Sequence, residues 1–367
     1  MKIGIDAYEA NVVQRVGIGR YAFELINALY QLKTAHEFVL FVPNKKATDL
    51  PASRKGWEYR EVKNARLWTY VSLPLALGKE ACDVVFSPTH YVPFFTSVPR
   101  VFSLMDLSYI YFPELFRLKD RFKLRFGTRH SVSVAKRICT ISAFSKNAIM
   151  NYYGVSGNQI SVTYPGIDHD LFFLQVDKKK IKEVQSKYAI DNGYILFVGT
   201  LQPRKNIVRL LEAFKKLNRN TLKLLIIGKK GWLYNVFFEK AEELGLNGKV
   251  VFTDFVDDRE LALLYSGARC FVLPSLYEGF GIPAVEAMAS GVPVVVSNVS
   301  SLPEIVGDAG ILVDPYRVES ITGGIEKVLA FSSKEREMLV KKGFVQSKRF
   351  NWIDCAKNTI QCLEEAI

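Results

Sequence analysis

The segment from Tyr277 to Val295, YEGFGIPAVEAMASGVPVV, places two carboxylates around a glycine turn. Glu278 and Glu286 stand eight positions apart, with Gly279 and Gly281 between them. Such a turn leaves backbone amides available to phosphate oxygens or sugar hydroxyls. Acids are also common near helix starts because the helix dipole favours them. That explanation accounts for Glu286 in a first helical turn, but poorly for the glycine turn together with Glu278. We therefore predict a binding site for a polar ligand, in which the carboxylates of Glu278 and Glu286 accept hydrogen bonds from two different sets of hydroxyl groups.

A second candidate site is the segment GTLQPRKN, residues 199–206, between a predicted strand and an amphipathic helix. Arg204 can clamp a diphosphate through its fork of donors, and Lys205 can act on it as a point charge. A solvated basic helix start is the alternative, but cations at a helix N-terminus oppose the dipole. We therefore predict that Gly199, Arg204 and Lys205 bind phosphate groups.

Gly17 and Gly19 lie in the segment GIGR just before the first predicted helix. The stretch fits the GxGxxA spelling of a dinucleotide site, with Glu37 downstream. That fingerprint should follow its strand almost directly, whereas some nine residues separate Ala7 from Gly17. A plain helix-start turn and a phosphate or sugar contact are the other interpretations, and we favour the last.

The loop DFVDD, residues 254–258, precedes another predicted helix. Asp257 or Asp258 is most simply a helix N-cap. A carboxylate there can also accept two hydrogen bonds from the edge of a guanine. Spacing alone favours the cap.

Composition limits the class of protein before these motifs are combined. The chain has 367 residues, enough for two domains, with 49% hydrophobic and 23% charged residues. Its net charge of +12 predicts an anionic partner such as nucleotide phosphates, nucleic acid or an acidic membrane. The five cysteines lack CxxC spacing and are typical of buried thiols in a reducing, cytoplasmic compartment. No apolar run reaches the ~18 residues of a membrane span, and the N-terminus reads as a strand.

Strand and helix signals alternate along the chain, which indicates parallel α/β domains. Strands are predicted at the following segments: KIGIDA, FVLFVP, DVVFSP, RVFSLMD and RICTIS in the first half, and YILFVGT, LKLLIIG, KVVFTDFV, CFVLPS and VPVVVSN in the second. The turn-rich segment YPGIDHDLFFLQVDKKKIK lies between the halves as a hinge. Two doubly wound domains should leave a cleft, with ligands outside the carboxyl ends of the strands.

Several motifs along the chain occur in an order that is similar to that of a known protein family. EGFGIPAVE is an E-x7-E element and occurs with RKN at 204–206, GIGRY at 17–21 and SLPEIVGDAG at 301–310. SAFSKNAI, YPGIDHDLF and RFNWIDCAKNTI extend the similarity over essentially the whole chain. The sequence resembles GT-B retaining glycosyltransferases of family 4, in particular bacterial and archaeal mannosyltransferases that build surface polysaccharides.

The resemblance implies an α/β GT-B fold of two Rossmann-like doubly wound parallel-sheet domains facing a central cleft. Residues 1–170 would form the acceptor-side domain, 171–349 the nucleotide-sugar domain, and a helix at 350–367 would cross back. Catalysis would fall to Glu278, Asp106, Arg204 and Lys205, without a metal or other cofactor. The implied donor-binding residues are Gly17, Gly19, Gly199, Arg204, Lys205, Val256, Asp258, Glu278, Gly279, Phe280, Gly281, Ile282 and Glu286.

By the same resemblance the protein would move a hexose, most simply mannose from GDP-mannose, onto a saccharide or lipid-linked saccharide with retention. A UDP-sugar donor is the first alternative, and a nucleotide-sugar epimerase or hydrolase is a weaker one. Outside this class stands a non-catalytic protein that binds nucleotide sugars or membranes. In relatives the first glutamate lies beside the donor sugar, the second binds ribose hydroxyls, and the Arg–Lys pair holds the diphosphate.

The sequence departs from the family pattern at SLMDLSY, residues 103–109. Many relatives place a histidine where Met105 stands, and a thioether cannot replace its hydrogen bond. Asp106 or a nearby group such as His90 could cover this role, or the donor is held differently. A structural loop histidine is the alternative for His90. For Asp106 we favour a functional role at the end of its strand.

Two other segments have competing interpretations. Asp168 and Asp170 spell DxD, a metal motif of another glycosyltransferase fold, but pairs of acids one residue apart arise often by chance. The stretch 117–137 has eight Lys or Arg against one acid, interleaved with aromatic residues. A solvated helix face is the plain interpretation. We predict instead a surface that rests on anionic lipid at the inner face of the membrane, and no nucleic-acid complex, because no recognition module accompanies it.

Overall fold

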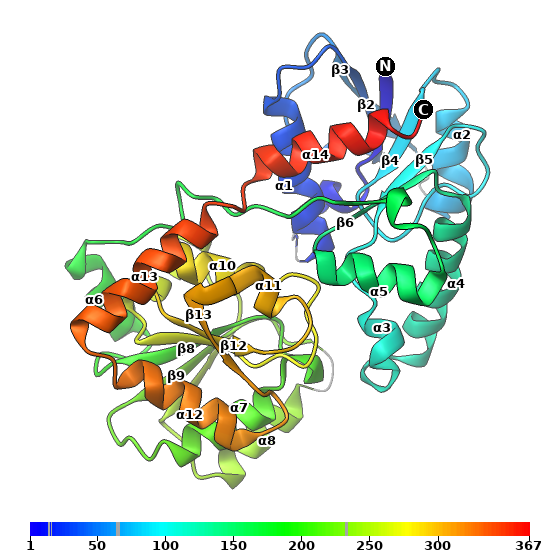
Figure 1. The fold of residues 1–367 in the computed structure, drawn as a ribbon. Helices are drawn as coiled ribbons and strands as arrows, with labels where there is room; N and C mark the ends of the chain where they lie inside the picture. Colours follow the sequence, from blue (N-terminus) through cyan, green and yellow to red (C-terminus); the bar gives the residue numbers. More distant parts are fainter. Residues whose placement is uncertain (14, 16, 64–66, 232–233) are drawn as a thin grey trace. The chain divides into compact units, whose positions relative to one another are not determined.

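The computed structural model describes residues 1–13, 15, 17–63, 67–231 and 234–367 (Figure 1). The chain divides into two compact units, Met1–Gly166 with Asn351–Ile367 and Ile167–Phe350. The sequence placed the corresponding breaks at 170/171 and 349/350. The first break lies earlier because residues 167–170 pack with the second unit, where the His169 ring Nε2 lies 3.0 Å from the Phe350 carbonyl oxygen.

The first unit is built on a seven-stranded sheet in the order β3-β2-β1-β4-β5-β6-β7. Every neighbouring pair is parallel. Its central strands are almost wholly buried, which is expected of a parallel sheet covered on both faces. The strands are β1 Lys2–Asp6, β2 Glu37–Pro43, β3 Trp57–Val62, β4 Val84–Ser87, β5 Arg100–Ser103, β6 Arg137–Thr140 and β7 Ile160–Val162.

Helices of the first unit pack on this sheet. They are η1 Glu9–Asn11, α1 Ile18–Gln31, η2 Trp68–Ser72, α2 Leu73–Leu77, α3 Ser108–Tyr111, η3 Pro113–Leu115, α4 Leu118–Val134, α5 Ala143–Tyr153, η4 Gly157–Gln159 and α14 Trp352–Glu364. The terminal helix α14 lies along α1, where Trp352 meets the edge of Tyr21 at 5.8 Å between ring centroids (Figure 1). The last segment of the chain therefore completes the fold of the first.

The second unit holds a six-stranded parallel sheet in the order β10-β9-β8-β11-β12-β13. Its strands are β8 Tyr194–Val198, β9 Lys223–Ile227, β10 Val250–Thr253, β11 Cys270–Leu273, β12 Val294–Ser297 and β13 Gly310–Val313. Its helices are α6 Lys178–Lys187, η5 Pro203–Lys205, α7 Ile207–Lys216, α8 Asn235–Glu243, α9 Asp258–Gly267, α10 Ile282–Ala289, α11 Leu302–Val306, η6 Gly307–Ala309, α12 Val318–Leu329 and α13 Ser333–Ser347. The loops after its strands carry most of the predicted site residues.

The α/β pattern predicted from the sequence is confirmed, and each predicted strand segment contains a strand. Three strands escaped prediction: β3, β7 and β13, all at sheet edges. Edge strands bury fewer side chains, so their apolar pattern is weaker. The strand β3 reads WEYREV, in which three of six residues are charged. All five cysteines are buried and free. Within the described residues, no helix has the length and apolar character that crossing a bilayer requires.

Candidate functional site

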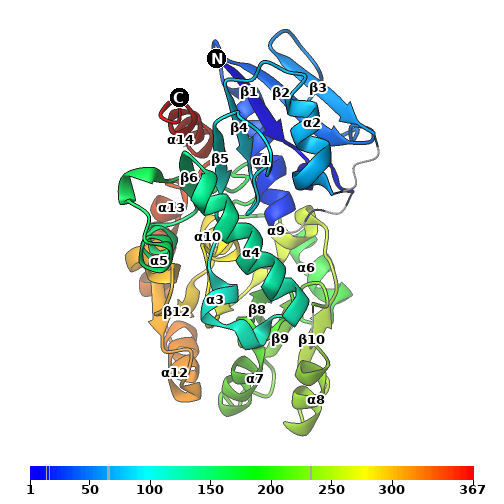
Figure 2. The same ribbon diagram turned by 90° about the vertical axis from the view of Figure 1, so that its right-hand side faces the viewer.

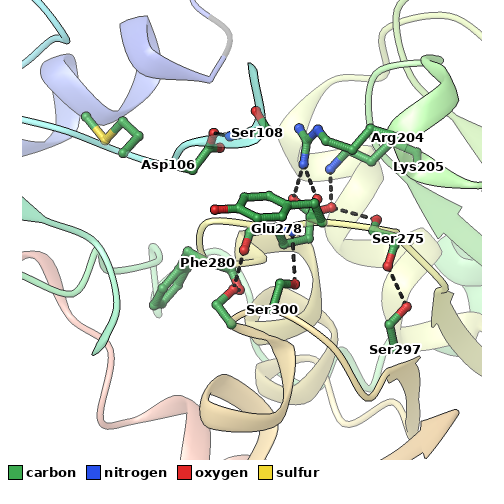
Figure 3. Close-up of polar contacts among 12 residues, drawn as sticks. Asp106, Ser108, Arg204, Lys205, Ser275, Glu278, Phe280, Ser297 and Ser300 are labelled. Atoms are coloured by element: carbon green, nitrogen blue, oxygen red, sulfur yellow. Dashed lines mark hydrogen bonds and ion pairs between the residues drawn. The ribbon is translucent and has the colours of Figure 1, made fainter. Parts of the chain in front are cut away.

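A buried carboxylate with two cations lies at the carboxyl edge of the second sheet. Glu278, in the loop after β11, is 5% exposed. Its Oε1 lies 2.5 Å from the Lys205 Nζ, and its Oε2 lies 3.0 Å from the Arg204 Nη1 (Figure 3). Ser275 donates a third hydrogen bond to Oε1 at 2.6 Å. The structure thus brings together the three predicted residues Arg204, Lys205 and Glu278.

The charges of this cluster determine its protonation state. Burial opposes ionisation of Glu278, but the Lys205 and Arg204 charges outweigh burial and lower its pKa to about 2. Glu278 is therefore a carboxylate at neutral pH and cannot serve as a general acid there. One negative charge faces two positive charges, which leaves a net positive site able to receive an anion.

The segment that carries the cations differs from its predicted form. Arg204 and Lys205 lie in the short 3-10 helix η5, and α7 begins only at Ile207. Between the two helices, Asn206 adopts a left-handed conformation with φ 59°. Its side-chain amide donates to the Pro274 carbonyl at 2.9 Å and to the Pro315 carbonyl at 2.7 Å. Asn206 therefore fixes the cationic segment against the loops that follow β11 and β13.

The glycine turn after Glu278 is held by serine hydroxyls. Ser301 donates to the carbonyls of Glu278 at 2.9 Å and Phe280 at 3.0 Å, and the Glu278 amide donates to the Ser300 hydroxyl at 3.0 Å (Figure 3). Gly281, with φ 106°, precedes Ile282, the first residue of α10. The left-handed conformation explains why a glycine stands at this position. Gly279 completes the turn, next to Phe280.

Glu286 stands one turn deeper in α10 than predicted. The helix begins at Ile282, so Glu286 belongs to the second turn and not the first. It is half-buried, and its Oε2 accepts a hydrogen bond from the Tyr265 hydroxyl at 2.9 Å. Tyr265 is fully buried on α9 and packs edge-on against Phe172. The second carboxylate is thus oriented by a tyrosine that the sequence analysis did not single out.

The remaining donor-loop residues fall at strand and helix ends. Gly199 follows β8, and Val256 is buried in the loop between β10 and α9. Asp257 is the N-cap of α9, with Oδ1 accepting from the Arg259 amide at 2.9 Å. Asp258 is the first helical residue. The cap interpretation is therefore confirmed for Asp257, and Asp258 stays the candidate for base recognition.

Local backbone geometry and packing explain why glycines stand at positions 17 and 19 of the first unit. Gly17 is the N-cap of α1 with φ 51°, and α1 begins at Ile18, so Gly19 lies inside the helix. A Cβ at Gly19 would come within 3.0 Å of the Glu9 carbonyl oxygen, which explains the glycine by close packing. Glu37 is the first residue of β2, at the opposite edge from the ligand-binding end of the sheet, which opposes the dinucleotide interpretation.

The segment after β5 shows how the chain accommodates Met105. Met105 is 7% exposed, and its backbone amide donates to the His90 Nε2 at 3.4 Å. Asp106 accepts from the Ser108 amide at 2.8 Å, an interaction that begins the short helix α3. His90 therefore lies beside Met105, the position that departs from the family pattern. Asp106 makes a structural contact, and its role in catalysis stays a prediction.

The DxD motif at residues 168–170 lies in a turn of the backbone. The Asp168 Oδ1 accepts from the amides of Asp170 at 3.0 Å and Leu171 at 3.1 Å. Across the part of the chain that the structure describes, no group of three or more His, Cys, Asp or Glu side chains could hold a metal ion. The structural interpretation of this pair is therefore favoured.

Sequence reasoning missed the supporting residues of the site: Asn206, Tyr265, Ser275, Ser300 and Ser301. Asn206 was visible as the third letter of RKN, and the serines as polar residues directly after β11 and β12. Tyr265 gave no signal, because its contact with Glu286 forms only when the consecutive helices α9 and α10 pack side by side.

The comparisons with known proteins cover both units. Residues 16–171 match the family model described as Glycosyltransferase Family 4, and residues 177–345 match that of Glycosyl transferases group 1. The chain is 33% identical over 381 aligned residues to O-antigen chain mannosyltransferase B of Escherichia coli, covering 98% of each protein.

Solved structures share the fold over nearly the whole chain. Sucrose-phosphate synthase from Thermosynechococcus elongatus superposes with a TM-score of 0.79 at 20% identity, covering 98% of this chain and 97% of that one. HepE from Anabaena, solved in complex with UDP and glucose, superposes with a TM-score of 0.77 at 18% identity over 99% of both chains. The predicted GT-B fold is thus confirmed, and the chain belongs to the family 4 glycosyltransferases.

Proposed function

We propose that this glycosyltransferase moves a mannosyl group from GDP-mannose onto a saccharide or lipid-linked saccharide, with retention of anomeric configuration. The observation that carries the proposal is the buried cluster of Glu278 with Arg204 and Lys205. The similarity to an O-antigen chain mannosyltransferase supports the choice of sugar.

The cluster suits the charge changes of glycosyl transfer. As the bond between the anomeric carbon and the phosphate oxygen breaks, negative charge grows on the diphosphate and positive charge on the sugar. Arg204 and Lys205 would stabilise the diphosphate, and the Glu278 carboxylate would favour the sugar cation. Such preorganised charges are usually the largest catalytic contribution. In this proposal the two cations take the place of a metal ion.

Retention would follow from attack on the face that the leaving group departs from. The acceptor oxygen forms its bond to the anomeric carbon as the phosphate bond breaks, and the acceptor proton passes to the departing phosphate oxygen. The pKa of about 2 keeps Glu278 ionised throughout, which suits charge stabilisation better than proton transfer.

Base selection would fall to the loop between β10 and α9. Asp257 caps the helix, so Asp258 is the carboxylate we assign to a guanine edge, beside the backbone of Val256. Glu286, held by Tyr265, would accept from the ribose hydroxyls.

The first test is calorimetric titration with GDP, UDP, ADP and dTDP in the presence of EDTA. We expect GDP to bind tightly and the others weakly. A GDP-mannose transfer assay in EDTA then tests metal independence, and the NMR coupling of the product's anomeric proton tests retention. Failure of every nucleotide to bind would overturn the proposal.

A UDP-sugar donor is the second candidate. The structural neighbour HepE was solved in complex with UDP and glucose. Tight binding of UDP with weak binding of GDP would assign the donor this way, and would keep the roles of the cationic cluster.

We further propose that α4 rests on an anionic membrane. Leu118, Phe122 and Phe126, here called the α4 stripe, are 74%, 74% and 59% exposed and recur at every fourth residue on one side of the helix. Lys and Arg flank the stripe at 119, 121, 123, 125 and 129. Apolar and cationic side chains on one helix face favour the interface of an anionic bilayer. Figure 2 shows α4 running along one face of the first unit.

This surface is tested by co-sedimentation with vesicles containing phosphatidylglycerol and with neutral phosphatidylcholine vesicles. Neutralising Arg121, Lys123 and Arg125 should abolish binding to the anionic vesicles. A matched control neutralises Lys334, Lys341 and Lys348 on and after α13. Equal binding of both triple variants would overturn the assignment. The buried free thiols support a reducing compartment, so in this proposal the surface would face the cytoplasmic side of the membrane.

A further inference from the structure

The second unit contains a polar cavity at the edge of its sheet where the central strands begin. Gly193 directly precedes β8 and Arg269 directly precedes β11, the neighbouring strand, and both residues line the cavity. Its volume of about 340 Å³ is typical of a site for a small molecule. In the described part of the chain, no large apolar side chain lines it. The cavity therefore suits a polar ligand.

This cavity is separate from the proposed donor site. The donor residues lie beyond the other ends of the same two strands, with Gly199 after β8 and Glu278 in the loop after β11. The five residues of β8 place its two ends about 15 Å apart. A diphosphate is too short to span that length, so a ligand in the cavity would be a second ligand.

Two arginine side chains line the cavity. Arg336, near the start of α13, donates from Nη1 to the Arg269 carbonyl at 2.7 Å and from Nη2 to the Ala268 carbonyl at 3.3 Å. These contacts cap the carboxyl end of α9, which is the plain explanation of Arg336. Capping does not explain Arg269. Its Nε lies beside Gly193, where an added Cβ would come within 3.1 Å of it.

The positive charge of the cavity is not neutralised by neighbouring acids. Glu337, the acid next to Arg336 in the chain, pairs with Lys341 at 2.8 Å. Among the residues that the structure describes, neither guanidinium makes an ion pair. Burial and the nearby Arg269 charge lower the pKa of Arg336, because two like charges oppose each other. With Asp191 as the single acid of the lining, one net positive charge remains to attract an anion.

We propose that this cavity, here called the Arg269 cavity, binds a small phosphate ester that carries hydroxyl groups, such as a sugar phosphate. Guanidinium groups bind phosphate oxygens through paired N–H donors, which assigns the phosphate to Arg269 and Arg336. Gln185 and Asp191 line the same cavity and supply an amide and a carboxylate, which suit the hydroxyl groups. The inference goes beyond the proposed function, which uses none of these residues.

The first experiment measures binding by calorimetric titration at low ionic strength. Inorganic phosphate and mannose 6-phosphate are titrated separately, with and without saturating GDP. We expect mannose 6-phosphate to bind more tightly than phosphate, because its hydroxyl groups add contacts, and GDP to change neither affinity. Equal affinity for the two would overturn the hydroxyl contacts. Competition by GDP would place the phosphate at the Arg204–Lys205 pair and overturn the second site.

Three variants then locate the ligand. Arg269→Gln should weaken binding of both compounds at least about tenfold, because a charge-assisted hydrogen bond is lost. Arg219→Gln is the matched control: Arg219 is exposed in the loop before β9 and outside the cavity lining, so the same loss of charge should have no effect. Asp191→Asn should tighten binding of inorganic phosphate about two- to threefold, because a like charge is removed.

Arg269 is exposed, so Arg269→Gln should keep the thermal unfolding temperature and the GDP affinity of the wild type. Unchanged phosphate binding in this variant, or an equal loss in Arg219→Gln, would overturn the Arg269 cavity. Phosphate held by Arg204 and Lys205 would remain bound in Arg269→Gln, which separates the two sites. A wild type that binds mannose 6-phosphate but no nucleotide would overturn the proposed function and support the cavity.

Discussion

At the scale of single residues, the carboxylate of Glu278 has two effects that experiments can separate, one on the rate of transfer and one on nucleotide affinity. It favours the sugar cation in the proposed mechanism, and it also occupies the two cations that would hold the diphosphate. In that mechanism the same carboxylate would accelerate the reaction and also compete with the substrate diphosphate for the two cations.

Glu278→Gln should lower kcat by at least about 100-fold, as expected for a lost electrostatic contact to the transition state. The affinity for GDP should stay the same or increase, because Arg204 and Lys205 are released for the diphosphate. Steady-state kinetics and calorimetry measure the two effects. Glu319→Gln, which breaks an exposed ion pair with Lys216 in the same unit, is the control and should change neither. A parallel loss of kcat and GDP affinity would contradict this account.

The depressed pKa of Glu278 also predicts a pH dependence of stability. Its pKa falls from 4.5 to about 2 on folding, so the stabilisation is fully present above pH 4.5 and is lost as the pH falls through 2. At pH 7, Glu278→Gln should reduce the free energy of unfolding by about 3–5 kcal/mol, because two buried cations lose their partner. By pH 3.5 this difference should shrink by roughly 1 kcal/mol. Urea unfolding of both proteins at pH 7, 5 and 3.5 checks this, and a constant difference would contradict it.

At the scale of elements, the position of the cations depends on how η5 is fixed. Asn206 ties this helix to the loops after β11 and β13 through two carbonyl acceptors. A shift of η5 would move both Arg204 and Lys205 relative to Glu278.

Asn206→Ala should cost about 1–3 kcal/mol of stability and raise KM for the nucleotide sugar, because two buried carbonyls lose their donor. Asn218→Ala is the control, since Asn218 has the same left-handed backbone after α7, with φ 48°. Both variants carry the same backbone strain, so their difference isolates the side-chain amide. Thermal unfolding and KM measurements compare them, and equal effects would show that only the backbone matters.

Most of these elements were predictable from the sequence, and the exceptions share a cause. Strands such as VPVVVSN are continuous apolar runs because both faces are covered, and glycines 279 and 281 marked the turn after Glu278. The edge strands and the contacts of Tyr265 and Asn206 were not predictable, since they depend on neighbours distant in sequence. Gly17 and Gly19 illustrate the opposite case. Their sequence motif resembles a ligand-binding loop, but the structure also explains both glycines by the geometry and packing at the start of α1.

At the scale of the whole molecule, the end of the chain belongs to the unit in which the chain begins. Cys355, Ile360 and Leu363 of α14 are buried in the first unit, whereas Lys357 faces solvent. The stability of the first unit should therefore depend on residues that follow the second.

Leu363→Ala should destabilise the first unit by about 2–5 kcal/mol, the usual cost of a large cavity in a core. Lys357→Ala is the control and should change stability by no more than about 0.5 kcal/mol. Hydrogen exchange resolved along the sequence measures the effect in each unit. We expect faster exchange in β1, β6 and β7 and unchanged exchange in β8 to β13. Equal acceleration in both units would contradict this division.

The internal ion pairs of Glu278 also bear on which solutes the empty protein attracts. A bare arginine and lysine side by side would collect orthophosphate, sulfate and other small anions of the cell. Here a carboxylate of the protein already fills that coordination, so a simple anion must displace it without compensation. A nucleotide sugar has base, ribose and hexose contacts to offset that displacement. In the proposed mechanism the buried Glu278 would thus compete with every anion for the two cations, and a ligand would bind only if its other groups make enough contacts to offset that competition.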